Sequence, residues 1–156
     1  MGKGHSVGSS SSFIYGFGGD GNDYIYGPED SGKSGQFGST GIKIYGDTDF
    51  VAEPVLFSVG EKKTTEGGKD KIFGGDNNMA DIFIYGEADD DVIYTGANNE
   101  DVTVYGDGEC LGGGTACHGN DIIHVENGND AVLVYGGAGN DKIVGGQVET
   151  SQTLFG

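Results

Sequence analysis

Aspartates recur in this sequence at the end of short glycine-rich runs, and an apolar residue follows two places later. The two most regular copies are Gly18–Tyr26 (GGDGNDYIY) and Gly136–Val144 (GGAGNDKIV). Glycines at the first, second and fourth places let the backbone turn tightly with positive φ, so that carbonyl oxygens gather near one point. The sixth-place aspartate adds a carboxylate. Two stacked turns of this kind supply the six to eight oxygens that a hard cation of calcium size binds.

Both copies match the pattern Gly-Gly-x-Gly-x-Asp-x-apolar-x, the nonapeptide of RTX proteins. The chain therefore resembles the repeats-in-toxin (RTX) family of calcium-binding parallel β-rolls. The resemblance implies that Ca²⁺ lies between turns of adjacent coils and is bound by loop carbonyls and by the sixth-place carboxylate. In the two regular copies it implies these site residues: Gly19, Gly21, Asp23, Gly137, Gly139 and Asp141, with Asp20 as an additional side-chain ligand.

The sixth-place acids form two columns when the turns are sorted by the edge of the roll on which they fall. We predict one column of Asp70, Asp91, Asp121 and Asp141, and a second of Asp23, Asp81, Asp101 and Asp130. Successive coils lie about 4.8 Å apart, so carboxylates without a counter-ion repel one another. We therefore expect the fold to need the metal.

The loops differ in how well they match the nonapeptide. The better matches are Gly18–Asp23, Glu126–Asp130 and Gly136–Asp141, followed by the partial matches His118–Asp121 and Gly86–Asp91. The poorer ones are Gly74–Asp81 with two extra residues, Gly67–Asp70 with two too few, and Asn98–Asp101 without glycines. We expect empty or altered sites at these last three.

Short strands that end in a glycine turn must position these loops. An apolar-Tyr-Gly signature recurs from Ile14-Tyr15-Gly16 to Val134-Tyr135-Gly136, and most neighbouring strands are about 9 to 12 residues apart. This spacing predicts an all-β fold, a parallel β-roll of about six two-strand coils in a single domain over residues 1–156. We expect strands ending near 15, 45, 73, 94, 124 and 144 on one face, and those ending near 26, 57, 85, 105, 135 and 155 on the other. The strand near 55–59 is placed by elimination.

Three coils are longer than the repeat requires, and the excess predicts loop insertions near 28–40, 47–68 and 107–117. The first and last of these are expected on the same edge. Alternation in Ile42-Lys43-Ile44-Tyr45 places the isoleucines inside and the lysine and tyrosine outside. Outward rings then form an aromatic ladder of Tyr26, Tyr85, Tyr105, Tyr135 and Phe155. Such a ladder suits a strand surface; alternatively it is a contact surface for another subunit or for sugar rings.

Composition limits the partners of this chain. It has 156 residues and a formal charge of −17, with 25 acidic residues against 8 lysines and no arginine. We expect no nucleic-acid or anionic-membrane partner, because little is present to neutralise phosphates. No apolar run is long enough to span a membrane. Cys110 and Cys117 indicate a local disulfide formed in an oxidising compartment, with two free thiols or a zinc site including His118 as the alternatives.

We expect no catalytic activity, because the repeat already explains the spacing of the aspartates. Neither end of the sequence shows a polar cap, and uncapped coils favour addition of another copy. The leading hypothesis is a secreted, extracellular or cell-surface structural protein whose calcium-loaded coils stack head to tail with copies of itself into a filament. The alternatives are a calcium-binding RTX module of a larger secreted toxin, hydrolase or adhesin, and an extracellular calcium buffer that does not assemble.

Overall fold

The chain folds into short parallel strands joined by tight turns. The computed structural model describes residues 13–18, 21–27, 41–46, 67–78, 81–108 and 118–156. These ranges contain eleven strands: β1 (Phe13–Phe17), β2 (Tyr24–Tyr26), β3 (Gly41–Tyr45), β4 (Lys71–Phe73), β5 (Ile82–Glu87), β6 (Val92–Tyr94), β7 (Asp101–Asp107), β8 (Ile122–His124), β9 (Ala131–Tyr135), β10 (Lys142–Val144) and β11 (Ser151–Phe155).

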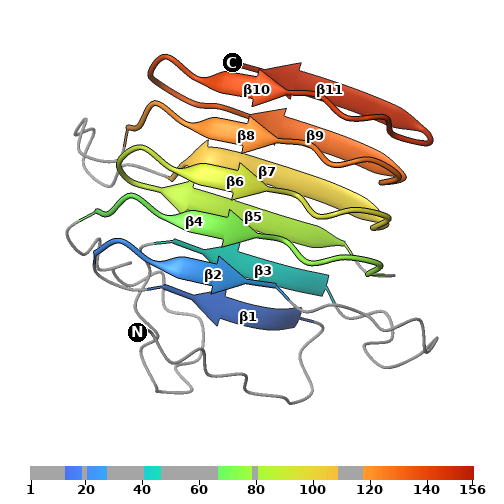
Figure 1. Cartoon of the computed structure of the whole chain (residues 1–156), viewed down its shortest axis with the longest axis horizontal. Helices are drawn as coiled ribbons and strands as arrows, with labels where there is room; N and C mark the ends of the chain where they lie inside the picture. The colour runs from blue at the N-terminus through green and yellow to red at the C-terminus, as the bar shows by residue number, and fades with distance from the viewer. Residues whose placement is uncertain (1–12, 19–20, 28–40, 47–66, 79–80, 109–117) are drawn as a thin grey trace, which may run out of the picture.

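Consecutive strands alternate between two sheets, as Figure 1 shows. The odd-numbered strands form a six-stranded sheet in the order β1-β3-β5-β7-β9-β11, and the even-numbered strands form a five-stranded sheet, β2-β4-β6-β8-β10. The described pairs are parallel, and equivalent residues stay in register from coil to coil, as Tyr85, Tyr105 and Tyr135 do. Each coil therefore contains one strand of each sheet. The predicted all-β parallel roll of about six coils is confirmed.

Alternation within each strand decides which side chains are buried, as predicted. Ile42 and Ile44 are buried, whereas Lys43 and Tyr45 are partly exposed on the outer face. The inward isoleucines and valines of both sheets form one continuous core between the two layers. Burying a side chain of this size stabilises the fold by about 1.5 to 3 kcal/mol. The repeat places such a residue at the same point of every coil.

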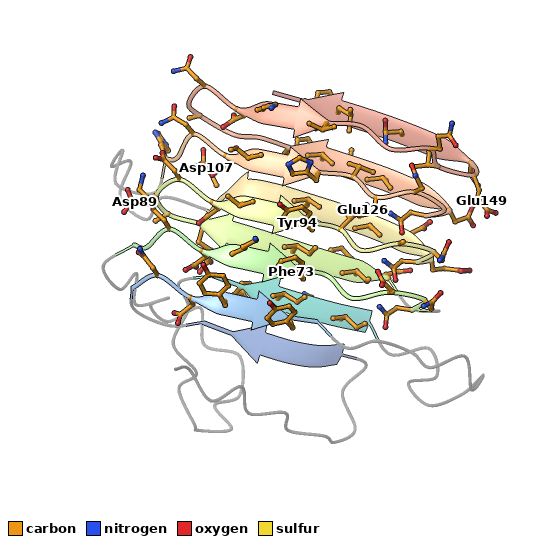
Figure 2. All side chains as sticks on the ribbon, in the orientation of Figure 1. Phe73, Asp89, Tyr94, Asp107, Glu126 and Glu149 are labelled. Carbon is orange, nitrogen blue, oxygen red and sulfur yellow. The ribbon has the colours of Figure 1, made fainter. Side chains whose placement is uncertain are left out.

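Two ladders of stacked rings cover the outer faces. One follows the six-stranded sheet through Tyr45, Tyr85, Tyr105, Tyr135 and Phe155, with centroids 4.7 to 5.2 Å apart. The other follows the five-stranded sheet through Tyr26, Phe73, Tyr94 and His124, with centroids 4.8 to 4.9 Å apart. Figure 2 shows Phe73 and Tyr94 one above the other on this sheet. Because neighbouring rings are nearly parallel, each ring covers part of the face of the next.

The predicted sorting of strands between the two faces is wrong for the first coils. β1 and β3 lie in the sheet of β5, β7, β9 and β11, and β2 lies in the sheet of β4. Tyr26 therefore belongs to the other ladder from the predicted one, and Tyr45 takes its place. The error follows from the extra strand placed near 55–59. These residues lie outside the described part of the chain. In the described part, β2 pairs with β4 and β3 pairs with β5.

The insertions fall on opposite edges rather than on the same edge. The segment 28–40 connects β2 to β3, from the five-stranded to the six-stranded sheet, whereas 109–117 lies between β7 and β8, in the opposite sense. The inserted residues themselves are outside the described ranges. As for membrane crossing, the described residues form no helix with the length and apolarity that a span requires.

Candidate metal sites along one edge of the roll

The two edges of the roll carry different buried polar residues. Turns that lead from the six-stranded to the five-stranded sheet end in Asp23, Asp70, Asp91, Asp121 and Asp141, and we call this side the Asp edge. Turns that lead back contain the buried residues Asn78, Asn99 and Asn129, and we call this side the Asn edge. In Figure 2, Asp89 and Asp107 mark the Asp edge, and Glu126 and Glu149 mark the opposite one.

The aspartates of the Asp edge form a ladder through one carboxylate oxygen. The backbone N–H of Asp23 donates to Oδ1 of Asp70 over 2.7 Å. The same bond joins Asp70 to Asp91, Asp91 to Asp121 and Asp121 to Asp141, over 2.8, 2.9 and 3.0 Å. Each aspartate lies two residues before an inward apolar residue, so the alternation that fills the core also turns the carboxylate inward.

The other carboxylate oxygen, Oδ2, is buried in this column. In Asp23, Asp121 and Asp141 it accepts no hydrogen bond. A buried anionic oxygen without a donor is costly, and native structures normally pair such an atom with a donor or a cation. The column therefore has unused ligand oxygens directed into the turn.

Glycine at the first place of the turn makes room for these oxygens. A Cβ at Gly106 would lie 2.2 Å from Oδ2 of Asp121 and 2.4 Å from the carbonyl oxygen of Gly136. Gly46, Gly86 and Gly136 face the Oδ2 of Asp70, Asp91 and Asp141 in the same way, at 2.2, 2.3 and 2.6 Å. Such distances exclude a side chain at this place. A carboxylate oxygen and a backbone carbonyl oxygen are thereby held close together.

The fourth place of the turn brings a second set of carbonyl oxygens close to the backbone of the next coil. A Cβ at Gly119 would lie 2.0 Å from the Asp89 carbonyl, and one at Gly139 only 1.8 Å from the Gly119 carbonyl. Gly139 and Gly137 also have φ of +150° and +106°, which L side chains rarely adopt. The predicted reason for these glycines, tight turns that gather carbonyls, agrees with this geometry.

One turn of the Asp edge has positive φ at its second and fourth places although neither place holds a glycine. Glu87 and Asp89 occupy the second and fourth places with φ of +85° and +68°. Glu87 is buried and lies in register with Asp107 of the next coil. Asp107 accepts hydrogen bonds from the backbone N–H groups of Gly119 and Ala138. Acids replace glycine at the second place in two successive turns, which adds further oxygens to this edge.

Burial and neighbouring carboxylates raise the pKa values of two aspartates at this edge. Burial raises the pKa of Asp121 to about 7, and the neighbouring carboxylates of Asp107 and Asp141 act in the same direction. Burial also raises the pKa of Asp107. Asp90 lies outside the column, and hydrogen bonds from Lys69 and Asn120 lower its pKa to about 2. Two carboxylates about 5 Å apart at an effective dielectric of about 20 repel by about 3 kcal/mol.

The Asp edge fits calcium, and the fit rests on its oxygens. Hard cations of this kind take carboxylate and carbonyl oxygens. Both are present here in a cleared space, with anionic Oδ2 atoms that lack donors. No three carboxylate, imidazole or thiol side chains converge in the described ranges, because each coil brings one aspartate into the column. Backbone carbonyls must therefore complete the ligand set, and the bound ion would neutralise the column.

The second predicted column does not form. Asp23 lies in the first column, bonded to Asp70, and not with Asp81, Asp101 and Asp130. Asp81 and Asp101 are exposed, and Asp130 is half-buried and accepts a hydrogen bond from the Thr150 hydroxyl. Asp81 and Asp101 each lie two residues before an outward residue, Phe83 and Thr103, so alternation turns them outward. An asparagine takes the inward position of the turn.

Two loops differ from their expected strength, one expected to be weak and one expected to be strong. Gly67–Asp70, two residues short of the repeat, still places Asp70 in the buried column. Glu126–Asp130, a better match, lies on the Asn edge. Gly21 has the expected left-handed φ of +93°. Four predicted residues, Gly19, Asp20, Cys110 and Cys117, lie outside the described ranges, so the disulfide stays a prediction.

The inward asparagines were missed, although the sequence contains a signal for them. Asn78, Asn99 and Asn129 each come five residues after an outward ring, Phe73, Tyr94 and His124 respectively. In turns of the Asp edge without an insertion the aspartate comes six residues after the ring, as Asp91 does after Tyr85 and Asp141 after Tyr135. The offset from the ring therefore distinguishes the two kinds of turn.

Parallel two-strand coils, with a glycine-cleared column of buried carboxylates on the turns, define a calcium-binding β-roll. The comparison with protein families identifies its repeat. Four copies of the RTX calcium-binding nonapeptide repeat match over residues 17–27, 83–99 and 119–147. The chain thus carries RTX repeats, which bind calcium ions. Neither the curated proteins nor the solved structures that were searched gave a significant match.

Proposed function

We propose that this chain is an extracellular structural module whose folding is driven by calcium. The observation that carries the proposal is the Asp edge, where buried Oδ2 atoms of Asp23, Asp121 and Asp141 accept no hydrogen bond. Without a cation the column opposes folding through repulsion and desolvation. A metal that binds only the folded chain adds its binding free energy to folding.

The charge of the chain favours a role outside the cell. With a formal charge of −17, the unfolded chain repels itself and stays expanded where calcium is scarce. Extracellular calcium modules bind with dissociation constants of about 10⁻⁴ to 10⁻³ M, a range that separates cytosolic from extracellular calcium. The chain would therefore stay unfolded in the cytosol and fold after export.

A calcium titration tests this proposal. Far-ultraviolet circular dichroism of the full chain should change from a disordered to a strand-rich spectrum as calcium is added, and EGTA should reverse the change. Magnesium at the same concentration should have little effect, because it prefers near-ideal octahedral geometry and keeps its water. A strand-rich spectrum that is unchanged by EGTA would contradict the proposal.

We assign no catalytic role to the chain. The buried carboxylates serve the edge of the roll, and the described histidine of strand β8, His124, stacks on Tyr94 with centroids 4.9 Å apart. The aromatic ladders remain candidates for carbohydrate or lateral protein contacts. Their partly covered ring faces favour contacts through ring edges, which suits a neighbouring protein surface better than stacking of sugars.

A second candidate function is head-to-tail assembly with copies of the same chain. β11 is the outermost strand of the six-stranded sheet, and its Leu154 and Phe155 are 38% and 50% exposed. A second copy whose β1 pairs with β11 would continue the parallel sheet and cover these side chains. Repetition of that contact gives an open filament.

Electron microscopy of the full chain in millimolar calcium tests the assembly. Filaments that disappear with EGTA are expected. Leu154→Asp should abolish them, whereas Thr153→Asp, on the outward side of the same strand, should preserve them. Isolated short rods of the unmodified chain would reject the filament and favour the alternative, a calcium-binding module of a larger secreted toxin, hydrolase or adhesin.

A further inference from the structure

We infer that the Asn edge is closed by side-chain amides in place of calcium, so that the chain binds its calcium ions along the Asp edge alone. The inference rests on the proposed calcium-driven folding. It adds that the turns of the Asp edge depend on the ion and that the turns of the Asn edge do not. It also departs from the repeat match, because the matched ranges 83–99 and 119–147 include the turns of Asn99 and Asn129.

The asparagines form the same backbone ladder as the aspartates. The N–H of Asn78 donates to Oδ1 of Asn99 over 2.9 Å, and the N–H of Asn99 donates to Oδ1 of Asn129 over 2.9 Å. Both columns thus use the first side-chain oxygen to join one coil to the next. The edges differ in the second atom, which is an anionic oxygen in one column and an NH₂ group in the other.

The NH₂ groups of the Asn edge already satisfy the oxygens of the turns. Asn129 Nδ2 donates to the carbonyls of Gly96 and Glu126, at 3.0 and 3.1 Å, and contacts the Thr95 hydroxyl at 3.2 Å. Asn99 Nδ2 donates to the carbonyls of Gly75 and Thr95, at 3.0 and 3.3 Å. These carbonyls converge on a donor nitrogen as ligands would converge on a cation.

A cation is excluded from this position for two reasons. The amide hydrogens carry partial positive charge and point toward the carbonyls, so a cation would have to displace them and break several buried hydrogen bonds. The aspartates described in these turns are exposed or already hydrogen-bonded: Asp81 and Asp101 are exposed, Asp76 accepts from the backbone N–H of Ala97, and Asp130 accepts from the Thr150 hydroxyl. The donor set of this edge therefore does not fit calcium, whereas that of the Asp edge does.

The first place of the turn supports the same distinction. On the Asn edge this place holds the buried residues Thr95 and Val125 in two turns and glycine, Gly74 and Gly145, in two others, whereas each described turn of the Asp edge has glycine there. The Thr95 hydroxyl accepts a hydrogen bond from the backbone N–H of Glu126 over 2.9 Å. At Thr95 and Val125, side chains fill the space that is kept open for an ion on the opposite edge.

Matched alanine variants of the full chain test the inference. Asn129→Ala and Asp121→Ala occupy corresponding columns. The number of calcium ions bound at saturation is measured by equilibrium dialysis, and the melting temperature by circular dichroism. We expect Asp121→Ala to bind fewer ions than the unmodified chain. Asn129→Ala should bind the same number and melt at a lower temperature. An equal loss of ions in both variants would overturn the inference.

Asn129→Asp provides a second measurement if Asn129→Ala does not fold. This variant places a carboxylate where the amide was, so we expect its stability to depend more steeply on calcium concentration than that of the unmodified chain. An unchanged calcium dependence would overturn the inference. An unmodified chain that binds no calcium would instead reject the proposed function, so the two failures are distinguishable.

Discussion

The two edges of the roll are built on the same ladder and differ by one atom per residue. In each column a backbone N–H donates to the Oδ1 of the following coil, at 2.9 Å both for Asp91 to Asp121 and for Asn99 to Asn129. The second atom then decides what the turn needs. An NH₂ group satisfies nearby carbonyls by itself, whereas an anionic oxygen among carbonyls needs a cation.

The space around that atom differs as well. At the first place of the turn the Asp edge has glycine, and a Cβ added at Gly106 would lie 2.2 Å from Oδ2 of Asp121. The Asn edge holds Thr95 and Val125 at the same place in two turns, and Gly74 and Gly145 in two others. A turn closed by amides therefore accepts a side chain in two cases where the Asp edge has glycine throughout its described turns.

The largest effect is expected when the cleared space is filled. Gly106→Ala places a Cβ against Asp121 Oδ2 and the Gly136 carbonyl, and backbone atoms cannot move aside cheaply. We expect a loss of about 3 kcal/mol or more and weaker calcium binding. Thr95→Ala is the matched change on the Asn edge and should leave the number of bound ions unchanged. Denaturant unfolding in calcium measures both, and equal effects on calcium binding would remove the distinction.

The second prediction replaces the Oδ2 atom of Asp121 with an NH₂ group. Asp121→Asn keeps the shape of the side chain and supplies an NH₂ group close to the Gly136 carbonyl. At limiting calcium, where the unmodified chain is partly unfolded, we expect this variant to be more stable by about 1 to 3 kcal/mol, because a buried charge is removed. In saturating calcium the order should reverse. Circular dichroism across a calcium titration tests the crossing, and a variant that is less folded at every calcium concentration would contradict it.

The third prediction concerns pH in the absence of calcium. Burial raises the pKa of Asp121 from 3.8 to about 7, so the folded chain holds this proton more tightly than the unfolded chain. This group therefore favours folding in EGTA most below pH 4 and progressively less as the pH rises toward 7, so the strand signal of the largely unfolded chain should grow as the pH is lowered. Asp121→Asn should reduce this slope in circular dichroism at a series of pH values. A slope of the opposite sign in the unmodified chain would contradict the assignment.

The smallest effect is expected away from both edges. Tyr105→Ala removes a ring that stacks on Tyr85 and Tyr135, with centroids 5.1 and 5.2 Å away. We expect a loss of about 1 kcal/mol with no change in the number of calcium ions bound. Thr103→Ala, on the same outer face, should cost less. A change in calcium binding on removal of Tyr105 would show that the ladder and the Asp edge are coupled.

The sequence was sufficient to predict the strands of this fold and the buried aspartates of the Asp edge. Period and alternation predicted the parallel coils and the inward Ile42 and Ile44, because the same contacts recur in each coil. The Asp edge was also recognisable, because each carboxylate lies two residues before a core residue, as Asp141 does before Ile143. Here spacing alone determines which way the side chain points.

The Asn edge could not be assigned by residue type alone. Asp101 is the first residue of β7 and resembles a sixth-place ligand, but it lies two residues before Thr103, which alternation places outside. Alternation therefore also places Asp101 outside. A shift of one residue between turn and strand reverses which side chain is buried. The sorting of β1, β2 and β3 between the two sheets was a second error, because it counted a half-turn at residues 55–59, which lie outside the described ranges.

The ladder of the Asp edge also gives the molecule a direction. Every contact runs from the backbone of one coil to the carboxylate of the coil that follows it in sequence, from Asp23 to Asp70 and onward to Asp141. A coil therefore receives an acceptor from its successor and offers one to its predecessor. The two ends of the stack are therefore complementary rather than equivalent, because one end offers carboxylate acceptors and the other offers backbone donors.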